Sequence, residues 1–100
     1  MALLRILSHP NIVALVDVYY TVNNCYIITE LCEGGSLQAR IDDHEGIEWQ
    51  KIAQQIGAAV QYLGNQGVIH RDIKPANVLV TGGNYKLCDF GFALKLNRKD

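Results

Sequence analysis

The segment that decides the fold reads Val68-Ile69-His70-Arg71-Asp72-Ile73-Lys74-Pro75-Ala76-Asn77-Val78-Leu79. Its apolar ends are typical of short buried strands, whereas five polar side chains fall within positions 70 to 77. Burying a charged group that lacks a partner costs free energy, so a cluster of charged residues between two buried strands indicates a functional site. A polar turn that only caps its neighbours is the structural alternative.

A second motif, Asp89-Phe90-Gly91, stands twelve residues after Asn77 and directly follows the β-type run Tyr85–Cys88. The turn Thr81-Gly82-Gly83-Asn84 predicts a hairpin between that run and Val78–Val80. An isolated Asp-Phe-Gly triplet arises easily by chance, but its place at the end of a strand favours a functional role.

The remaining elements are predicted from periodicity and turn residues. Apolar residues spaced by three and four from Trp49 to Leu63 predict a helix over Ile47–Asn65. The other expected elements are the end of a buried helix at Met1–Ser8, an antiparallel hairpin of Ile12–Thr21 and Cys25–Leu31, a short helix at Leu37–Asp43 and a short apolar piece at Val68-Ile69.

Composition narrows the class of protein. One hundred residues, 49% hydrophobic and 19% charged, form at most one small domain and exclude a disordered chain. Nine basic against ten acidic residues give a net charge of −1, without the basic excess of a nucleic-acid or membrane-surface binder. No apolar run reaches the ~20 residues of a membrane span. Three cysteines without a CxxC pair predict a reducing, cytoplasmic location.

The polar segment His70–Asn77 followed by Asp89-Phe90-Gly91 resembles the catalytic loop and metal-binding motif of eukaryotic protein serine/threonine kinases. His9-Pro10-Asn11-Ile12-Val13 is similar to the turn after the kinase C-helix, and residues 30–35 are similar to the hinge. The resemblance implies an α+β, partial protein-kinase-like fold. Residues 1–31 would end the small lobe, and residues 32–100 would form the hinge and the first helices and catalytic loop of the large lobe.

The resemblance also implies transfer of the γ-phosphate of ATP to a protein serine or threonine hydroxyl. Asp72 would accept the hydrogen bond, and later the proton, of that hydroxyl. Lys74 would reach the transferred phosphoryl group, and a lysine there resembles the serine/threonine class. Asn77 and Asp89 carry hard oxygen donors, which suit Mg²⁺.

The nucleotide contacts implied by the resemblance lie mainly around the hinge. Glu30 and Cys32 would offer backbone groups to adenine, Thr29 would line the pocket behind, and Ser36 would reach the ribose. Leu79 would form the pocket floor, and Cys88 would face the pocket. Four residues resemble the stacked side chains that link the two lobes: Leu4, Leu15, His70 and Phe90.

The chain lacks several kinase parts, namely the glycine-rich loop, the strand lysine, the C-helix glutamate and the activation segment. Because these parts supply positioning and electrostatics, we expect little activity from the isolated 100 residues. The alternative hypothesis is a noncatalytic, kinase-derived module that binds nucleotide or protein. A third is an incomplete gene product without a function of its own.

Overall fold

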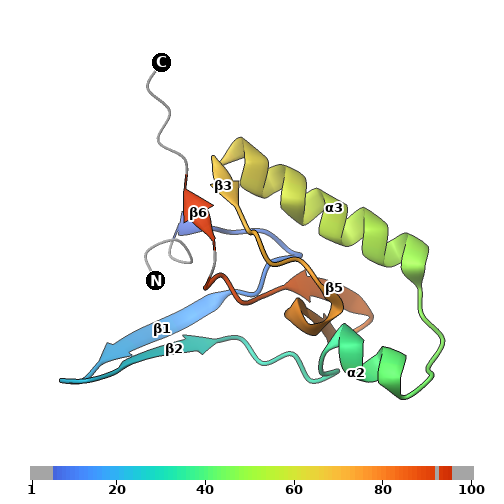
Figure 1. The fold of residues 1–100 in the computed structure, drawn as a ribbon, viewed down its shortest axis with the longest axis horizontal. Coiled ribbons are helices and arrows are strands. Elements are labelled where there is room, and N and C mark those ends of the chain that lie inside the picture. Colours follow the sequence, from blue (N-terminus) through green and yellow to red (C-terminus); the bar gives the residue numbers. More distant parts are fainter. Residues whose placement is uncertain (1–5, 92, 96–100) are drawn as a thin grey trace.

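The computed structural model describes residues 6–91 and 93–95. It is a flattened arrangement of α-helices and short antiparallel strand pairs, with extents of 42 × 38 × 19 Å (Figure 1). This confirms the predicted α+β class and the partial kinase-like architecture. The expected helix Met1–Ser8 falls mostly outside the described residues. Of its described part, Ile6 is helical and the next two residues are not.

The first strand pair is the hairpin of β1 (Leu15–Tyr20) and β2 (Cys25–Thr29). Both strands are shorter than predicted. Residues 12–14 leave the hairpin because Ile12 bridges Leu87 and the Val13 N–H donates to the Leu87 carbonyl at 3.0 Å. A register shift between Leu15 and Asp17 marks a bulge, and the hairpin projects away from the rest of the chain (Figure 1).

Helix α2 (Leu37–Asp42) begins at a capping serine. The Ser36 Oγ accepts a hydrogen bond from the Ala39 N–H at 3.1 Å, which satisfies a donor left unpaired in the first turn. The helix ends one residue earlier than predicted.

The longest helix is α3 (Trp49–Asn65), which begins two residues later than predicted because Glu48 occupies the cap position. Ile52, Ile56, Ala59 and Leu63 form its buried face. Trp49 and Val60, which belong to the predicted apolar stripe, are exposed instead. The helix packs on β5 and β3, and residues after it turn at Gly67, whose φ is +72°.

The polar segment His70–Asn77 follows β3 (Val68–Ile69) and ends in the 3₁₀ turn η1 (Pro75–Asn77), which leads directly into β4 (Val78–Thr81). The β4 strand pairs with β5 (Asn84–Leu87) through the predicted turn, in which Gly82 and Gly83 both have positive φ. Strand β5 is shifted by one residue from the expected run. A last strand, β6 (Leu94–Lys95), was not predicted and pairs with β3.

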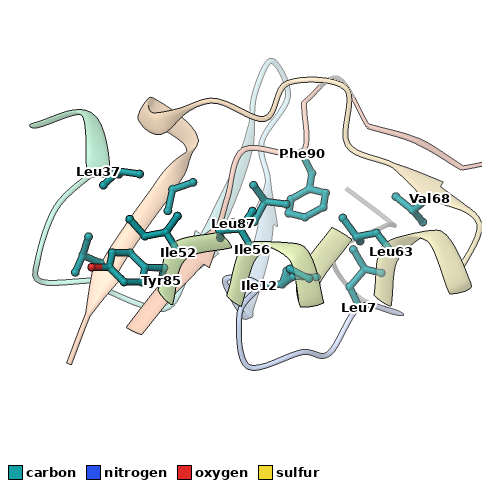
Figure 2. Close-up of a cluster of buried hydrophobic side chains, with 13 residues drawn as sticks. Leu7, Ile12, Leu37, Ile52, Ile56, Leu63, Val68, Tyr85, Leu87 and Phe90 are labelled. Atoms are coloured by element: carbon teal, nitrogen blue, oxygen red, sulfur yellow. The ribbon is translucent and has the colours of Figure 1, made fainter. Parts of the chain in front are cut away.

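One apolar cluster joins these elements (Figure 2). Its 13 buried members come from both ends of the described chain: Leu7, Ile12, Leu37, Ile52, Ile56, Ala59, Leu63, Val68, Val78, Val80, Tyr85, Leu87 and Phe90. Leu87 is fully buried and Phe90 nearly so, which anchors both ends of the segment that carries Asp89.

Among residues 6–91 and 93–95, no helix is long and apolar enough to cross a bilayer.

Candidate active site

The β4–β5 hairpin frames the candidate site. Strand β4 begins directly after Asn77, and β5 ends two residues before Asp89. Because Val78 pairs with Leu87 in the antiparallel ladder, the two motifs leave the same end of the hairpin. The Cys88 N–H then donates to the Asn77 carbonyl at 2.9 Å, which extends that pairing to the neighbour of Asp89.

The buried side chain of His70 contacts residues of both motifs. The ring is 2% exposed, and its Nδ1 accepts a hydrogen bond from the Asp72 N–H at 3.1 Å. Its Nε2 lies 2.8 Å from the Cys88 carbonyl, so this nitrogen carries the hydrogen and donates. The ring also meets Phe90 edge to face, with centroids 4.8 Å apart. His70 therefore links the backbone of Asp72 to Cys88 and Phe90, the two neighbours of Asp89 in the chain.

Of the four predicted stacked residues, His70 and Phe90 are in contact and Leu15 packs against the apolar core. Leu4 lies outside the described residues.

Asp72, Lys74 and Asn77 form one polar cluster. Asn77 Nδ2 donates to the Asp72 carbonyl at 2.8 Å and to Asp72 Oδ2 at 3.0 Å. Lys74 Nζ lies 3.7 Å from Asp72 Oδ1, and this lysine remains largely exposed. The amide nitrogen of Asn77 is thus committed to Asp72, which leaves Oδ1 as the donor atom for a cation.

Both motifs contain a non-glycine residue in the left-handed region. The φ angle is +71° at Arg71 and +56° at Asp89. Such a conformation costs about 1–3 kcal/mol and persists only where the surroundings enforce it. The composition of the motifs does not reveal this strain, because it is a property of the backbone path.

Asp89 itself is exposed, and its Oδ1 accepts a hydrogen bond from the Gly91 N–H at 3.2 Å. The bond turns the chain back immediately after the aspartate. A Cβ on Gly91 would lie 3.2 Å from that same carboxylate oxygen, so a glycine is favoured at this position.

The predicted hinge residues follow β2. Thr29 Oγ1 donates a long hydrogen bond, 3.4 Å, to the carbonyl of Glu30, one of the two residues whose backbone is expected to contact adenine. The Glu30 N–H is used within the fold, because it donates to the Ala14 carbonyl at 2.9 Å. Cys32 is buried, and burial is the main reason that its thiol pKa is raised.

Beyond the hinge, the chain is tied directly to β4. The Gly34 N–H donates to the Val80 carbonyl, and the Val80 N–H donates to the Gly35 carbonyl, both at 2.8 Å. Ser36 forms an isolated bridge with Leu79, so these two predicted nucleotide-contact residues lie side by side. The structure therefore brings the exit of the hinge onto the strand that follows the catalytic loop.

Cys88 is half-buried beside Asp89. Burial raises the pKa of its thiol to about 11, with smaller contributions from the charge of Asp89 and from Cys32. The thiol is therefore neutral at physiological pH.

The donor set fits Mg²⁺ bound with a nucleotide. Magnesium takes few protein ligands, usually one or two carboxylates, and completes its shell with water and phosphate oxygens. The Asp89 carboxylate and Asn77 Oδ1 supply such a set. In the described part of the chain, no three His, Cys, Asp or Glu side chains gather into a metal-binding group.

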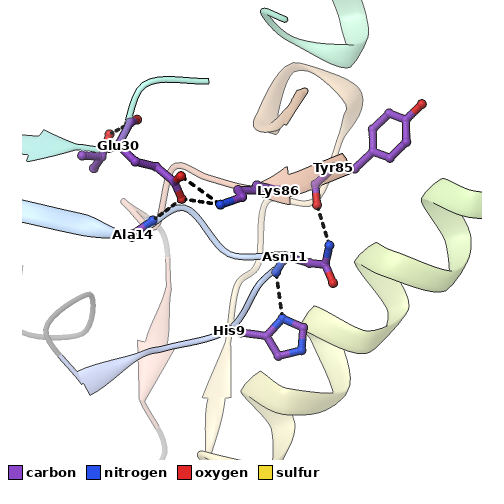
Figure 3. A network of polar contacts seen from close by, with 7 residues as sticks. His9, Asn11, Ala14, Glu30, Tyr85 and Lys86 are labelled. Atoms are coloured by element: carbon purple, nitrogen blue, oxygen red, sulfur yellow. Dashed lines mark hydrogen bonds and ion pairs between the residues drawn. The ribbon is translucent and has the colours of Figure 1, made fainter. Parts of the chain in front are cut away.

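One polar contact in this region has no local sequence signal. The Glu30 carboxylate pairs with Lys86 at 2.7 and 2.8 Å, although 56 positions separate the two residues (Figure 3). The sequence offers two weak indications of this ion pair: the alternation of buried and less buried side chains along β5, and an acidic residue in the predicted hinge. Both residues also line a cavity of about 680 Å³, whose lining includes no predicted catalytic residue.

The protein-family model described as "Protein kinase domain" matches residues 1–100 of this chain. Ribosomal protein S6 kinase alpha-1 from Homo sapiens is 41% identical over 106 residues, covering 98% of this chain and 14% of that protein. Serine/threonine-protein kinase 36 from Pongo abelii is 44% identical over 94 residues, covering 91% and 7%. Cell division control protein 7 from Schizosaccharomyces pombe is 46% identical over 99 residues, covering 95% and 9%.

This chain thus spans less than a sixth of the length of these relatives. The family match nevertheless extends over every residue of the chain, including the catalytic-loop segment and the Asp89 motif. The chain belongs to the protein kinase domain family.

Proposed function

We propose that this chain forms the central part of the catalytic site of an ATP- and Mg²⁺-dependent protein serine/threonine kinase. The observation that carries the proposal is the hydrogen-bonded unit of Asp72, Asn77 and the backbone N–H of Cys88, the residue directly before Asp89. The lysine at position 74 and the serine/threonine kinase named among the relatives support the serine/threonine class.

In this proposal Asp72 holds the attacking hydroxyl and takes its proton. The Asp72 N–H is fixed by His70, and its carbonyl and one carboxylate oxygen are fixed by Asn77, so the side chain has little freedom to turn. Such preorganisation is the main contribution a protein makes to phosphoryl transfer. Lys74 places a positive charge beside Asp72, where negative charge develops on the transferred group.

Asn77 Oδ1 and the Asp89 carboxylate would hold the cation. A bound Mg²⁺ would neutralise part of the negative charge of the phosphates. The chain contributes by keeping the two donors at one end of the β4–β5 hairpin, through the Cys88 N–H bond to Asn77. Adenine would lie against the backbone of Glu30 and Cys32, with Thr29, Ser36, Leu79 and Cys88 around the nucleotide.

The protein substrate and a reducing compartment are part of the same proposal. Lys74 is exposed and Asp72 is partly exposed beside it, which suits a hydroxyl presented by another protein. All three cysteines, Cys25, Cys32 and Cys88, are free thiols, which favours a location such as the cytoplasm.

The test compares phosphotransfer by the full-length protein with its Asp72→Asn and Asp89→Asn variants. We expect both to lower kcat at least 100-fold, because each removes a group that acts only during transfer. Asp42→Asn is the matched control, since Asp42 lies exposed on α2, where its carboxylate accepts a hydrogen bond from Gln38. Unchanged turnover in both site variants would reject the assigned roles.

A nucleotide titration separates the enzyme from the noncatalytic module. The proposal expects Mg²⁺-dependent binding of ATP that weakens in Asp89→Asn. Binding that is independent of Mg²⁺, or no binding, would favour the noncatalytic reading instead.

A further inference from the structure

The Glu30 side chain joins three segments that are distant in the sequence. Its Oε1 accepts a hydrogen bond from the Ala14 N–H at 2.9 Å, while the Glu30 N–H donates to the Ala14 carbonyl. Both carboxylate oxygens also accept from Lys86 Nζ, at 2.7 and 2.8 Å (Figure 3). One carboxylate therefore fixes the entry of β1, the hinge and β5 relative to one another.

Lys86 lies on β5, the strand that leads to Asp89. It pairs with Leu79 in the β4–β5 ladder and precedes Asp89 by three residues. Any displacement of β5 relative to the hinge therefore displaces the proposed cation ligand relative to the proposed adenine contacts. The ion pair is a direct side-chain link between the hinge and β5, in addition to the backbone bonds that Gly34 and Gly35 form with Val80 of β4.

Partial burial gives the contact its strength. The side chains of Lys86 and Glu30 are 18% and 27% exposed, and the two oxygens receive short, charge-assisted bonds. Burial alone would raise the pKa of Glu30, but the bonds from Lys86 and Ala14 outweigh it and lower that pKa. The carboxylate is thus ionised and paired across the physiological range.

We propose that Glu30 and Lys86 are a positioning pair that sets the distance between the adenine-binding hinge and the Asp89 strand. This inference rests on the proposed function, because it assumes that nucleotide binds between these two parts. Neither side chain touches the nucleotide in the proposal. The pair acts through the backbone of residue 30 on one side and through β5 on the other.

The test measures the KM for ATP, kcat and the Kd for Mg²⁺–ADP in the full-length protein and in Lys86→Met, Glu30→Gln and Lys86→Arg. We expect Lys86→Met and Glu30→Gln to raise KM and Kd roughly three- to tenfold while kcat changes less than about twofold. Lys86→Arg keeps the charge and restores most of the affinity. Lys51→Met, which removes a lysine from α3, is the matched control and leaves all three quantities unchanged.

The double variant Glu30→Gln/Lys86→Met sharpens the test. If the two residues act as a pair, its KM equals that of the single variants, because the second change removes nothing further. If a single variant fails to fold, Glu30→Asp decides, since the shorter side chain cannot reach Ala14 and Lys86 together.

An unchanged KM and Kd in the variants, or a loss of kcat alone, would overturn the positioning role while leaving the proposed function intact. A parent protein that binds no Mg²⁺–ADP would instead overturn the proposed function, and the positioning pair with it.

Discussion

Gly34 occupies a place where the backbone of the hinge exit lies against β4. A Cβ at this residue would come within 2.6 Å of the Val80 carbonyl and 2.9 Å of the Val80 Cβ. Contacts of this length do not occur in folded proteins, and the first of them is with backbone that cannot swing away. The hinge exit and β4 would have to separate at the point where they exchange hydrogen bonds.

We therefore expect Gly34→Ala to lower the free energy of unfolding by about 1–3 kcal/mol, as overpacking usually does. Gly57→Ala is the matched control, because a Cβ at Gly57 meets nothing within 4 Å and alanine favours the helix by about 0.5–1 kcal/mol. Urea denaturation of both variants measures the difference. A Gly34→Ala protein as stable as the parent would contradict the close approach seen here.

Cys88 and Cys25 differ in their surroundings although both are free thiols. Cys25 is exposed, whereas Cys88 is partly buried beside Asp89 with its pKa raised to about 11. Only the thiolate reacts with alkylating reagents, so Cys88 should react slowly at neutral pH.

We expect iodoacetamide at pH 7.5 to modify Cys25 while Cys88 stays largely unmodified, as read by mass spectrometry of the digested protein. The rate at Cys88 should then rise as the pH approaches about 11, where the thiolate forms. Modification of Cys88 as fast as Cys25 at pH 7.5 would show that the raised pKa is wrong.

At the residue scale the candidate site was largely predictable, because the identities and spacing of Asp72, Asn77 and Asp89 are local features of the sequence. What could not be predicted is how each side chain is held. Two features depend on the path of the chain after folding. One is the left-handed backbone at Arg71 and Asp89, and the other is the pair of hydrogen bonds that Asn77 Nδ2 donates to Asp72.

Helix α3 is the element that supports the rest. It packs on both β5 and β3, and Leu63 on its buried face is only 1% exposed. Polar bonds add to this packing, because the Gln55 Oε1 accepts from the Tyr85 N–H at 2.8 Å and Glu48 accepts from the Tyr85 hydroxyl at 3.0 Å.

We expect Leu63→Ala to lower the free energy of unfolding by about 2–5 kcal/mol, since it leaves a cavity in the core. Val60→Ala, on the exposed side of the same helix, should change it by less than about 0.5 kcal/mol. Thermal and urea unfolding of the two variants test this. Equal losses from both substitutions would mean that the buried face of α3 is misassigned.

The elements themselves show where sequence patterns succeed and fail. The β4–β5 hairpin was predicted because Gly82 and Gly83 permit the positive φ of its turn. Strand β6 was missed because Leu94–Lys95 is a strand only through its pairing with β3, about 25 residues earlier in the chain. Ile12 and Val13 likewise pair with Leu87 at the end of β5 and not with β2.

For the whole molecule, the arrangement depends on contacts between distant segments. The turn at residues 8–11 is fixed on α3 and β5, since the Ser8 N–H donates to the Tyr62 hydroxyl and Asn11 Nδ2 donates to the Tyr85 carbonyl. Family resemblance correctly indicated this architecture. The particular pairs that hold it, such as Glu30 with Lys86, have no signature in a single sequence because their partners lie more than 50 residues apart.

The proposed site depends on Asn77 and Asp89 holding a cation together beside Asp72. A crystal structure of the full-length protein with Mg²⁺ and a nonhydrolysable ATP analogue tests this. We expect one Mg²⁺ with Asn77 Oδ1 and an Asp89 carboxylate oxygen both at about 2.0–2.1 Å, and the γ-phosphate facing Asp72. A metal–nucleotide complex bound elsewhere, with these side chains directed away from it, would refute the proposed cation site.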